Sequence, residues 1–192
     1  MSYDSKRYAL VNRWDPRHLE TVERLLAPAP GERILEVGCG RGHLTKRLRA
    51  IGAHAVGIDA NPHAADVAVT DGIETMDAAS LSFESDTFDK IVSVHAIEHI
   101  PPIDEAFSEM SRVLKPGGQA LYIYPAEPIK GIWAVPTAII LYGNPFKATT
   151  VHCHWLWPSK LRSIAEPNGL QERHAEFNLL SSPQFVSLFQ ND

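Results

Sequence analysis

The sequence has few cysteines, no run of basic residues and no long apolar segment. Cys39 and Cys153 are its only cysteines, which do not make a disulfide framework or a C-x-x-C pair, so we expect a reducing cytoplasm. The net charge of −5, without a Lys/Arg cluster, argues against a nucleic-acid partner. Neither end shows the basic start and apolar core of a signal peptide, so we expect none. No apolar run reaches the roughly 20 residues of a transmembrane helix.

The turn between residues 34 and 45 organises the rest of the chain. A short apolar strand leads into Gly38, Gly40 and Gly42, and a helix begins behind them. Three alternate glycines remove the side chains that would keep a ligand away from the backbone. Asp59 ends the next apolar run, about 20 residues further on. This spacing predicts a nucleotide-like ligand at the carboxyl edge of a parallel sheet, with its ribose hydroxyls on Asp59.

The glycine pattern separates two classes of cofactor. The dinucleotide fingerprint G-x-G-x-x-G requires a third glycine where His43 stands. The sequence from Glu36 to Gly42 is instead E-x-G-x-G-x-G, which resembles the first motif of class I S-adenosylmethionine-dependent methyltransferases. The resemblance continues through the stretch 77–94, which contains D-A and F-D-x-I-V, and through the R-V-L-K-P-G-G of 112–118. These resemble methyltransferases of type 11 and of quinone biosynthesis, over the first two-thirds of the chain.

This resemblance implies a single α/β domain with a Rossmann-like, doubly wound, mostly parallel sheet of seven strands. It divides the chain into a helical cap (1–30), a cofactor-binding core (31–124), an apolar insert or lid (125–157), and a C-terminal helix with edge strands (158–192). The apolar runs predict strands at 34–37, 55–58, 73–76, 90–94, 119–124, 171–177 and 185–189. We expect the last to be a short antiparallel edge strand.

The implied cofactor is S-adenosylmethionine. In the resembling family the glycine loop passes the methionine part of this cofactor, the acid after the second strand binds the ribose, and a D-A pair binds the adenine amino group. Asp77 matches that pair, although an Asp at this place also caps turns. We expect the cofactor to contact Glu36, Gly38, Cys39, Gly40, Gly42, Asp59, Ala60, Asp77, Ala78 and His95.

A methyl transfer needs a base only if the acceptor must lose a proton. His95, at the carboxyl end of the fourth predicted strand, and His99 are the candidates, because histidine titrates near neutrality. His99 has an alternative role in bonding a backbone carbonyl. No metal is expected, since the spacing of His152, His154 and His174 matches no structural zinc pattern.

The uncharged, apolar stretch 131–142 has four possible roles. It can line a pocket for an apolar acceptor, act as a lid, rest on a membrane surface, or form a buried helix over the sheet edge. We therefore expect a small-molecule or lipid-like acceptor, with Tyr8, Trp133, His152 and His154 as candidate contacts. A non-catalytic cofactor-binding protein of this fold, and an NAD-dependent oxidoreductase, remain the alternatives.

Overall fold

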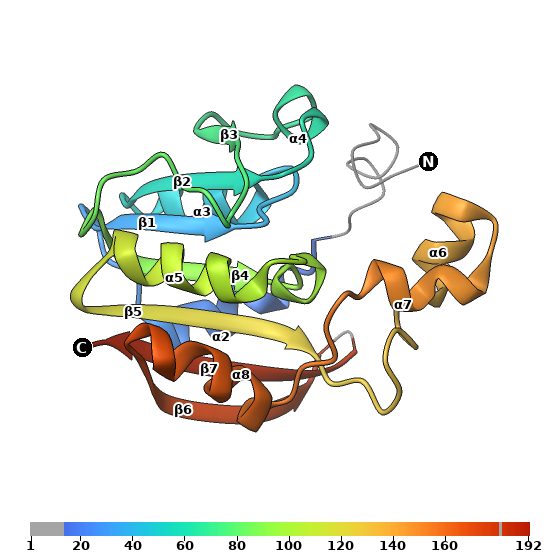
Figure 1. The fold of residues 1–192 in the computed structure, drawn as a ribbon. Coiled ribbons are helices and arrows are strands. Elements are labelled where there is room, and N and C mark those ends of the chain that lie inside the picture. The colour runs from blue at the N-terminus through green and yellow to red at the C-terminus, as the bar shows by residue number, and fades with distance from the viewer. Residues whose placement is uncertain (1–13, 181) are drawn as a thin grey trace.

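The computed structural model describes residues 14–180 and 182–192. A seven-stranded sheet runs through the molecule, and helices cover both of its faces (Figure 1). The strand order is β3-β2-β1-β4-β5-β7-β6. The strands are β1 (Arg33–Val37), β2 (His54–Asp59), β3 (Ile73–Thr75), β4 (Phe88–Val94), β5 (Leu114–Pro125), β6 (Leu170–Leu179) and β7 (Pro183–Asn191).

Strands β1 to β5 are parallel, and β7 runs antiparallel to both of its neighbours. The predicted α/β fold with a mostly parallel sheet of seven strands is therefore confirmed. The strand order reverses between β1 and β4. In open α/β sheets, ligands bind outside the carboxyl ends of the strands at such a switch point.

The C-terminal strand corrects one expectation. Residues 185–189 were expected at the sheet edge, but β7 lies between β5 and β6, and β6 forms the edge. Val186 and Phe189 are fully buried in the cores on opposite faces of the sheet, and burial on both faces suits an interior strand. Strand β6 carries charged residues such as Glu172 and Arg173, and charges suit an exposed edge.

Two hydrophobic cores lie on opposite faces of the sheet. Helices α2 (Arg17–Leu26) and α3 (His43–Ala50) pack into one core, and α5 (Ile103–Val113) and α8 (Pro158–Ala165) pack into the other. The Asp15 carboxylate accepts the N–H of Arg17, the first residue of α2, at 3.0 Å. Shorter helices outside the insert are α4 (His63–Asp66) and the 3₁₀ helices η1 (Ile97–His99) and η3 (Glu166–Asn168).

The insert, residues 125–157, extends beyond the carboxyl end of β5 and away from the sheet (Figure 1). It contains α6 (Val135–Tyr142), η2 (Pro145–Lys147) and α7 (Ala148–Val151). These pack on a small core of their own, formed by Ala134, Ala138, Ala148 and Val151. Ile139 is 50% exposed, so the alternative of a buried helix over the sheet edge is wrong. Within the described ranges, no helix combines the length and apolar character needed to cross a membrane.

Candidate active site

A cavity of about 400 Å³ opens at the carboxyl ends of β1 to β4. Its wall is built from the residues that end each strand, together with two residues of the insert. The lining residues include Gly38, Asp59, Ala60, Asn61, Met76, Asp77, Ala78, His95, His99, Thr150 and Cys153. Several polar side chains thus converge on a largely apolar hollow, which is the usual composition of a small-molecule site.

The glycine loop brings two strand ends close together. Gly38 follows β1 with φ of 73°, and a Cβ atom on it would lie only 2.1 Å from the Cβ of Ala96. A Cβ on Gly42 would lie 2.5 Å from the side chain of Ile73. Packing therefore requires glycine at position 38, whereas at position 42 the positive φ of 75° is the main reason for glycine. Gly38 also lines the cavity, so there the bare backbone serves both packing and ligand access.

Asp59 ties this loop to β2. One of its oxygens accepts the N–H of Gly40 and the other accepts the N–H of Asn61, each at 2.8 Å. Burial raises the pKa of Asp59, and the two N–H donors work against that rise. Each carboxylate oxygen has a second lone pair. The carboxylate can therefore also accept hydroxyl groups of a ligand in the cavity, as the predicted ribose role requires.

Asp77 lies across the cavity from the glycine loop, after β3. One of its oxygens accepts the N–H of Ala79 at 2.9 Å. Asp77 therefore caps the turn, which was the alternative role expected from the sequence. Asp77 and Ala78 nevertheless line the cavity, beside Met76 and the prolines of 101–102. Such apolar surroundings suit a flat heterocycle. The capping role is thus present, and the adenine role stays a prediction.

Glu36 supports the loop from below the cavity. Its carboxylate accepts the backbone N–H of Thr45 at 2.7 Å and also the Thr45 hydroxyl. Burial raises the pKa of Glu36 to about 7, although both bonds to Thr45 act in the opposite direction. Glu36 and Cys39 line a second, smaller cavity of about 60 Å³, together with Trp14 and Arg41. Tyr8, a candidate acceptor contact, lies outside the described residues.

His95 lines both cavities, and its backbone is unusual. Its φ is 51°, a left-handed conformation that is uncommon outside glycine. Its Nε2 lies 2.9 Å from Oε1 of Gln184, and its Nδ1 lies 3.7 Å from Oε1 of Glu98. Burial lowers the pKa of His95, but Glu98 and Gln184 outweigh it, and the pKa ends above its usual value. A base must be unprotonated, so His95 could act as a base only at a pH above its raised pKa. The base role of His95 stays a prediction.

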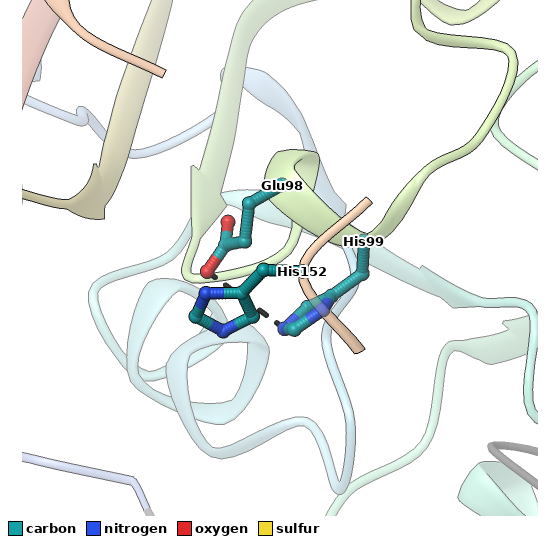
Figure 2. A group of neighbouring side chains, drawn as sticks. All are labelled: Glu98, His99 and His152. Atoms are coloured by element: carbon teal, nitrogen blue, oxygen red, sulfur yellow. Dashed lines mark ion pairs between the residues drawn. The ribbon is translucent and has the colours of Figure 1, made fainter. Parts of the chain in front are cut away.

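Figure 2 shows Glu98, His99 and His152 grouped at the junction with the insert. Their potential ligand atoms lie within 4.8 Å of one another, and two histidines with one carboxylate are a combination found at metal sites. Here each histidine has a protein partner. His99 Nδ1 lies 2.7 Å from the carbonyl oxygen of Val151, and His152 Nδ1 lies 2.8 Å from a carboxylate oxygen of Glu127. The His99 contact joins the loop after β4 to the insert, whereas Glu127 and His152 both lie within the insert.

The charges of these side chains act on one another. Burial alone would raise the pKa of Glu98, but the surrounding His99, His95 and His152 lower it to about 2. The pKa of His99 is itself lowered, first by burial, against the attraction of Glu98. The backbone-bonding role foreseen for His99 is present, and His99 also lines the cavity.

The residues of the insert that were predicted to contact the acceptor do not line the cavity of about 400 Å³. The indole N–H of Trp133 donates to the carbonyl oxygen of Ala126, and His154 bonds the carbonyl oxygen of Ile100. Among the described residues, Trp133, His152 and His154 do not line the large cavity, and their acceptor role stays a prediction. Thr150 and Cys153 line it instead. Nothing in their sequence neighbourhood marks them, whereas Asn61, two residues after Asp59, stands where a ligand contact is expected.

Comparison with known proteins identifies the family. The methyltransferase domain family matches residues 6–175, which is most of the chain. The chain belongs to the methyltransferase domain family. This membership agrees with the E-x-G-x-G-x-G motif and decides against the dinucleotide-binding alternative.

Curated relatives of this methyltransferase domain include ubiquinone biosynthesis O-methyltransferases. The mouse mitochondrial protein is 32% identical over 170 residues, covering 74% of this chain and 42% of the relative. The protein from Bordetella avium is 26% identical over 190 residues, covering 92% and 78%. The chain spans less than half the length of the mouse and rat relatives that it matches.

Solved structures share the fold of this methyltransferase domain. The cyclase SpnF aligns with a TM-score of 0.72 at 16% identity, covering 91% of this chain and 80% of that chain. An S-adenosylmethionine-dependent methyltransferase from Methanosarcina mazei aligns with a TM-score of 0.65 at 20% identity, covering 84% and 92%. A cyclase and a methyltransferase therefore use the same architecture, and the reaction must be argued from the site.

Proposed function

We propose that this methyltransferase domain transfers a methyl group from S-adenosylmethionine to an oxygen of a small, apolar or lipid-like acceptor. The observation that carries the proposal is Asp59: its carboxylate is fixed on the glycine loop and faces a cavity of about 400 Å³. The free thiols of Cys39 and Cys153 fit the cytoplasm as the proposed compartment.

The chain's own residues bind and orient the reactants. The cofactor supplies an electrophilic methyl group when bound, and the reaction needs the acceptor oxygen about 3–3.5 Å from it and in line. Asp59 holds the ribose hydroxyls of the cofactor, and Asp77 and Met76 border the place for its adenine. Thr150 and Cys153 cover the cavity from the insert and exclude water. Positioning of this kind supplies most of the acceleration that the proposal requires.

The acceptor class rests on the relatives and on the insert. The curated relatives are named as O-methyltransferases of ubiquinone biosynthesis, which supports an oxygen on an apolar molecule. The insert adds a large exposed apolar surface next to the cavity. Its exposed apolar side chains are Ile129, Ile132, Trp133, Ile139, Ile140, Tyr142 and Phe146. An acceptor with a long apolar part would have a surface to follow toward the site.

We propose further that the insert contacts an anionic lipid surface. Residues 128–165 contain no Asp or Glu but include Lys130 and Lys147, although the whole chain carries a net charge of −5. Exposed apolar side chains next to lysines, with no acidic residue among them, are suited to an anionic lipid surface. Contact there would bring a lipid-dissolved acceptor close to Thr150 and Cys153.

Transfer of a labelled methyl group tests the main proposal. The full chain is incubated with methyl-labelled S-adenosylmethionine and with phenols that do or do not carry a polyprenyl tail. We expect the label on the tailed phenols and the demethylated cofactor as co-product. An absence of binding to S-adenosylmethionine and its demethylated product would overturn the proposal. Binding without transfer to any acceptor would identify a cofactor-binding protein that is not an enzyme of this class.

Co-sedimentation with vesicles tests the lipid contact. We expect binding to vesicles that contain phosphatidylglycerol and weak binding to vesicles of phosphatidylcholine alone. A double variant, Ile139→Ser with Ile140→Ser, should lose the binding. Leu179→Ser is the matched control, because Leu179 is 70% exposed but lies on β6. Equal loss in the double variant and the control would contradict the proposal.

A further inference from the structure

A buried amide joins two histidines at the wall of the site. Gln184 of β7 is fully buried, and its Oε1 lies 3.1 Å from Nε2 of His18 and 2.9 Å from Nε2 of His95. The two imidazole rings lie 5.4 Å apart between centroids. A carbonyl oxygen only accepts hydrogen bonds, so each ring presents an N–H at Nε2. Helix α2, strand β7 and the end of β4 therefore meet at one amide group.

This contact fixes the second nitrogen of His95. With Nε2 on Gln184, the Nδ1 atom faces the carboxylate of Glu98 at 3.7 Å. A neutral ring would direct its Nδ1 lone pair at that carboxylate, whereas a protonated ring directs a second N–H there. The geometry therefore favours the imidazolium form of His95. The left-handed backbone of His95 holds the ring in this position.

The charged groups around His95 act in both directions. Glu98 and, more remotely, Asp15 favour its charged form, whereas His18 and His99 face it as titratable neighbours of the same sign. The balance raises the pKa of His95. The pKa of His18 is lowered, first by burial and then by His95. At any given pH the charged form is therefore favoured more at His95 than at His18.

Stability alone does not account for this cluster. The Nδ1 of His18 and the Nε2 of Gln184 are buried and have no hydrogen-bond partner within the part of the chain that the structure describes. Buried polar groups without partners are unfavourable for folding, and so is a left-handed conformation at a residue such as His95. Unfavourable features concentrated beside a ligand cavity indicate that the arrangement serves the site.

We propose that Gln184 is a positioning residue, which holds His95 as a charged imidazolium at the wall of the cofactor cavity. The part of this proposal that concerns methyl transfer rests on the proposed function. A charged His95 favours an acceptor oxygen that has lost its proton to water, and the oxygen–carbon bond then forms as the sulfur–carbon bond breaks. An acidic hydroxyl, such as a phenol, fits this requirement better than an alcohol. His95 would then act through its charge and not as a base.

Histidine proton resonances of the full chain, without cofactor or acceptor, test the proposal. His95→Asn identifies the resonance of His95. We expect Gln184→Leu, which removes the acceptor oxygen, to lower the pKa of His95 by about one unit. Gln184→Glu keeps an acceptor and adds a charge, so it should raise that pKa. Gln190→Leu is the matched control on the same strand, since its amide bonds the carbonyl oxygen of Gly117.

The opposite directions of the two shifts separate positioning from simple structural support. If Gln184→Leu fails to fold, the upward shift in Gln184→Glu still tests the proposal. An unchanged pKa of His95 in the folded Gln184 variants would overturn it. These measurements need no methyl transfer, so they can succeed or fail independently of the proposed function.

The pH profile of methyl transfer gives the kinetic readout. If the charged form of His95 is the active one, the rate falls as pH rises through the pKa of His95. We expect that limb to move about one unit lower in Gln184→Leu and higher in Gln184→Glu. A rate that rises with pH through the same pKa would show that His95 is a base and would overturn the charged role.

Discussion

The floor of the cavity and the insert above it are held together in different ways. The floor is built from β1 to β4, whose core residues, such as Leu35 and Val92, are fully buried. The insert has a small core of three alanines and a valine, and polar contacts of His99 and His154 attach it to the loop after β4. The comparison distinguishes the frame, which β1 to β4 form around the cavity, from the insert, which packs on a core of its own and carries the surface that we propose for the acceptor.

The largest expected effect concerns the frame. Gly38→Ala would place a Cβ 2.1 Å from that of Ala96, so we expect it to lower the free energy of unfolding by more than about 3 kcal/mol and to abolish cofactor binding. Gly143→Ala is the matched control: Gly143 in the insert also has a positive φ, 64°, but open space around it. It should cost only about 1–2 kcal/mol. Urea unfolding measures both, and equal losses would contradict the distinction between the regions.

Two buried glutamates sharpen the comparison through pH. The pKa of Glu36, in the frame, is raised to about 7, and the pKa of Glu98, at the junction with the insert, is lowered to about 2. The native state keeps the proton of Glu36 longer than the unfolded chain does. The contribution of Glu36 to the free energy of unfolding therefore falls as pH rises from about 4.5 to about 7. At about 1.4 kcal/mol per pKa unit, the loss is about 3 kcal/mol.

Glu98 works with the opposite sign. Its native pKa lies below the unfolded value, so its contribution is lost as pH falls from about 4.5 toward about 2. Urea unfolding of the native chain and of Glu36→Gln, at about pH 5 and about pH 7, measures the first effect. The variant should lose the decline between these values. An identical decline in both proteins would show that another group is responsible.

Asp59 gives the next effect in size. Asp59→Ala should weaken binding of S-adenosylmethionine by about 1.5–3 kcal/mol, the range for lost hydrogen bonds to a charged group. Asp104→Ala, in the first turn of α5, is the control and should leave the affinity unchanged. Titration calorimetry measures both. Unchanged affinity in Asp59→Ala would remove Asp59 from the ribose.

The smallest effect is expected on the surface of the insert. Ile139→Ala should change the free energy of unfolding by less than about 0.5 kcal/mol, because half of this side chain is exposed. Ile91→Ala, in the fully buried β4, should cost about 2–5 kcal/mol. Comparable losses in the two variants, measured in urea, would show that the insert is packed as firmly as the frame.

The sequence predicts the frame well because the signals there are local. Apolar runs, the glycine spacing and the distance to Asp59 lie within short stretches, and they predict that seven strands form and that Asp59 ends the second of them. The predicted edge position of the last strand was wrong, because the partners of an antiparallel strand are set by contacts across the whole chain. The meeting of His18, His95 and Gln184 joins residues far apart in sequence, and no local pattern marks it.

The insert lies between these extremes. Its apolar composition is plain in residues 131–142, but a helix inside the protein and a helix against lipid have the same composition. Only the exposure of side chains such as Ile139 and Phe146 separates the two. Thr150 and Cys153 could not be predicted as cavity residues, because their position depends on how the chain returns from α6 toward η1.

A crystal structure of the full chain with S-adenosylmethionine tests the central claim most directly. We predict the ribose hydroxyls within hydrogen-bond distance of the Asp59 carboxylate, the adenine beside Asp77 and Met76, and the methyl group directed toward the side of the cavity that His95 forms. A ligand bound elsewhere, or a cavity that stays empty at saturating cofactor while Asp59 bonds only Gly40 and Asn61, would contradict the account.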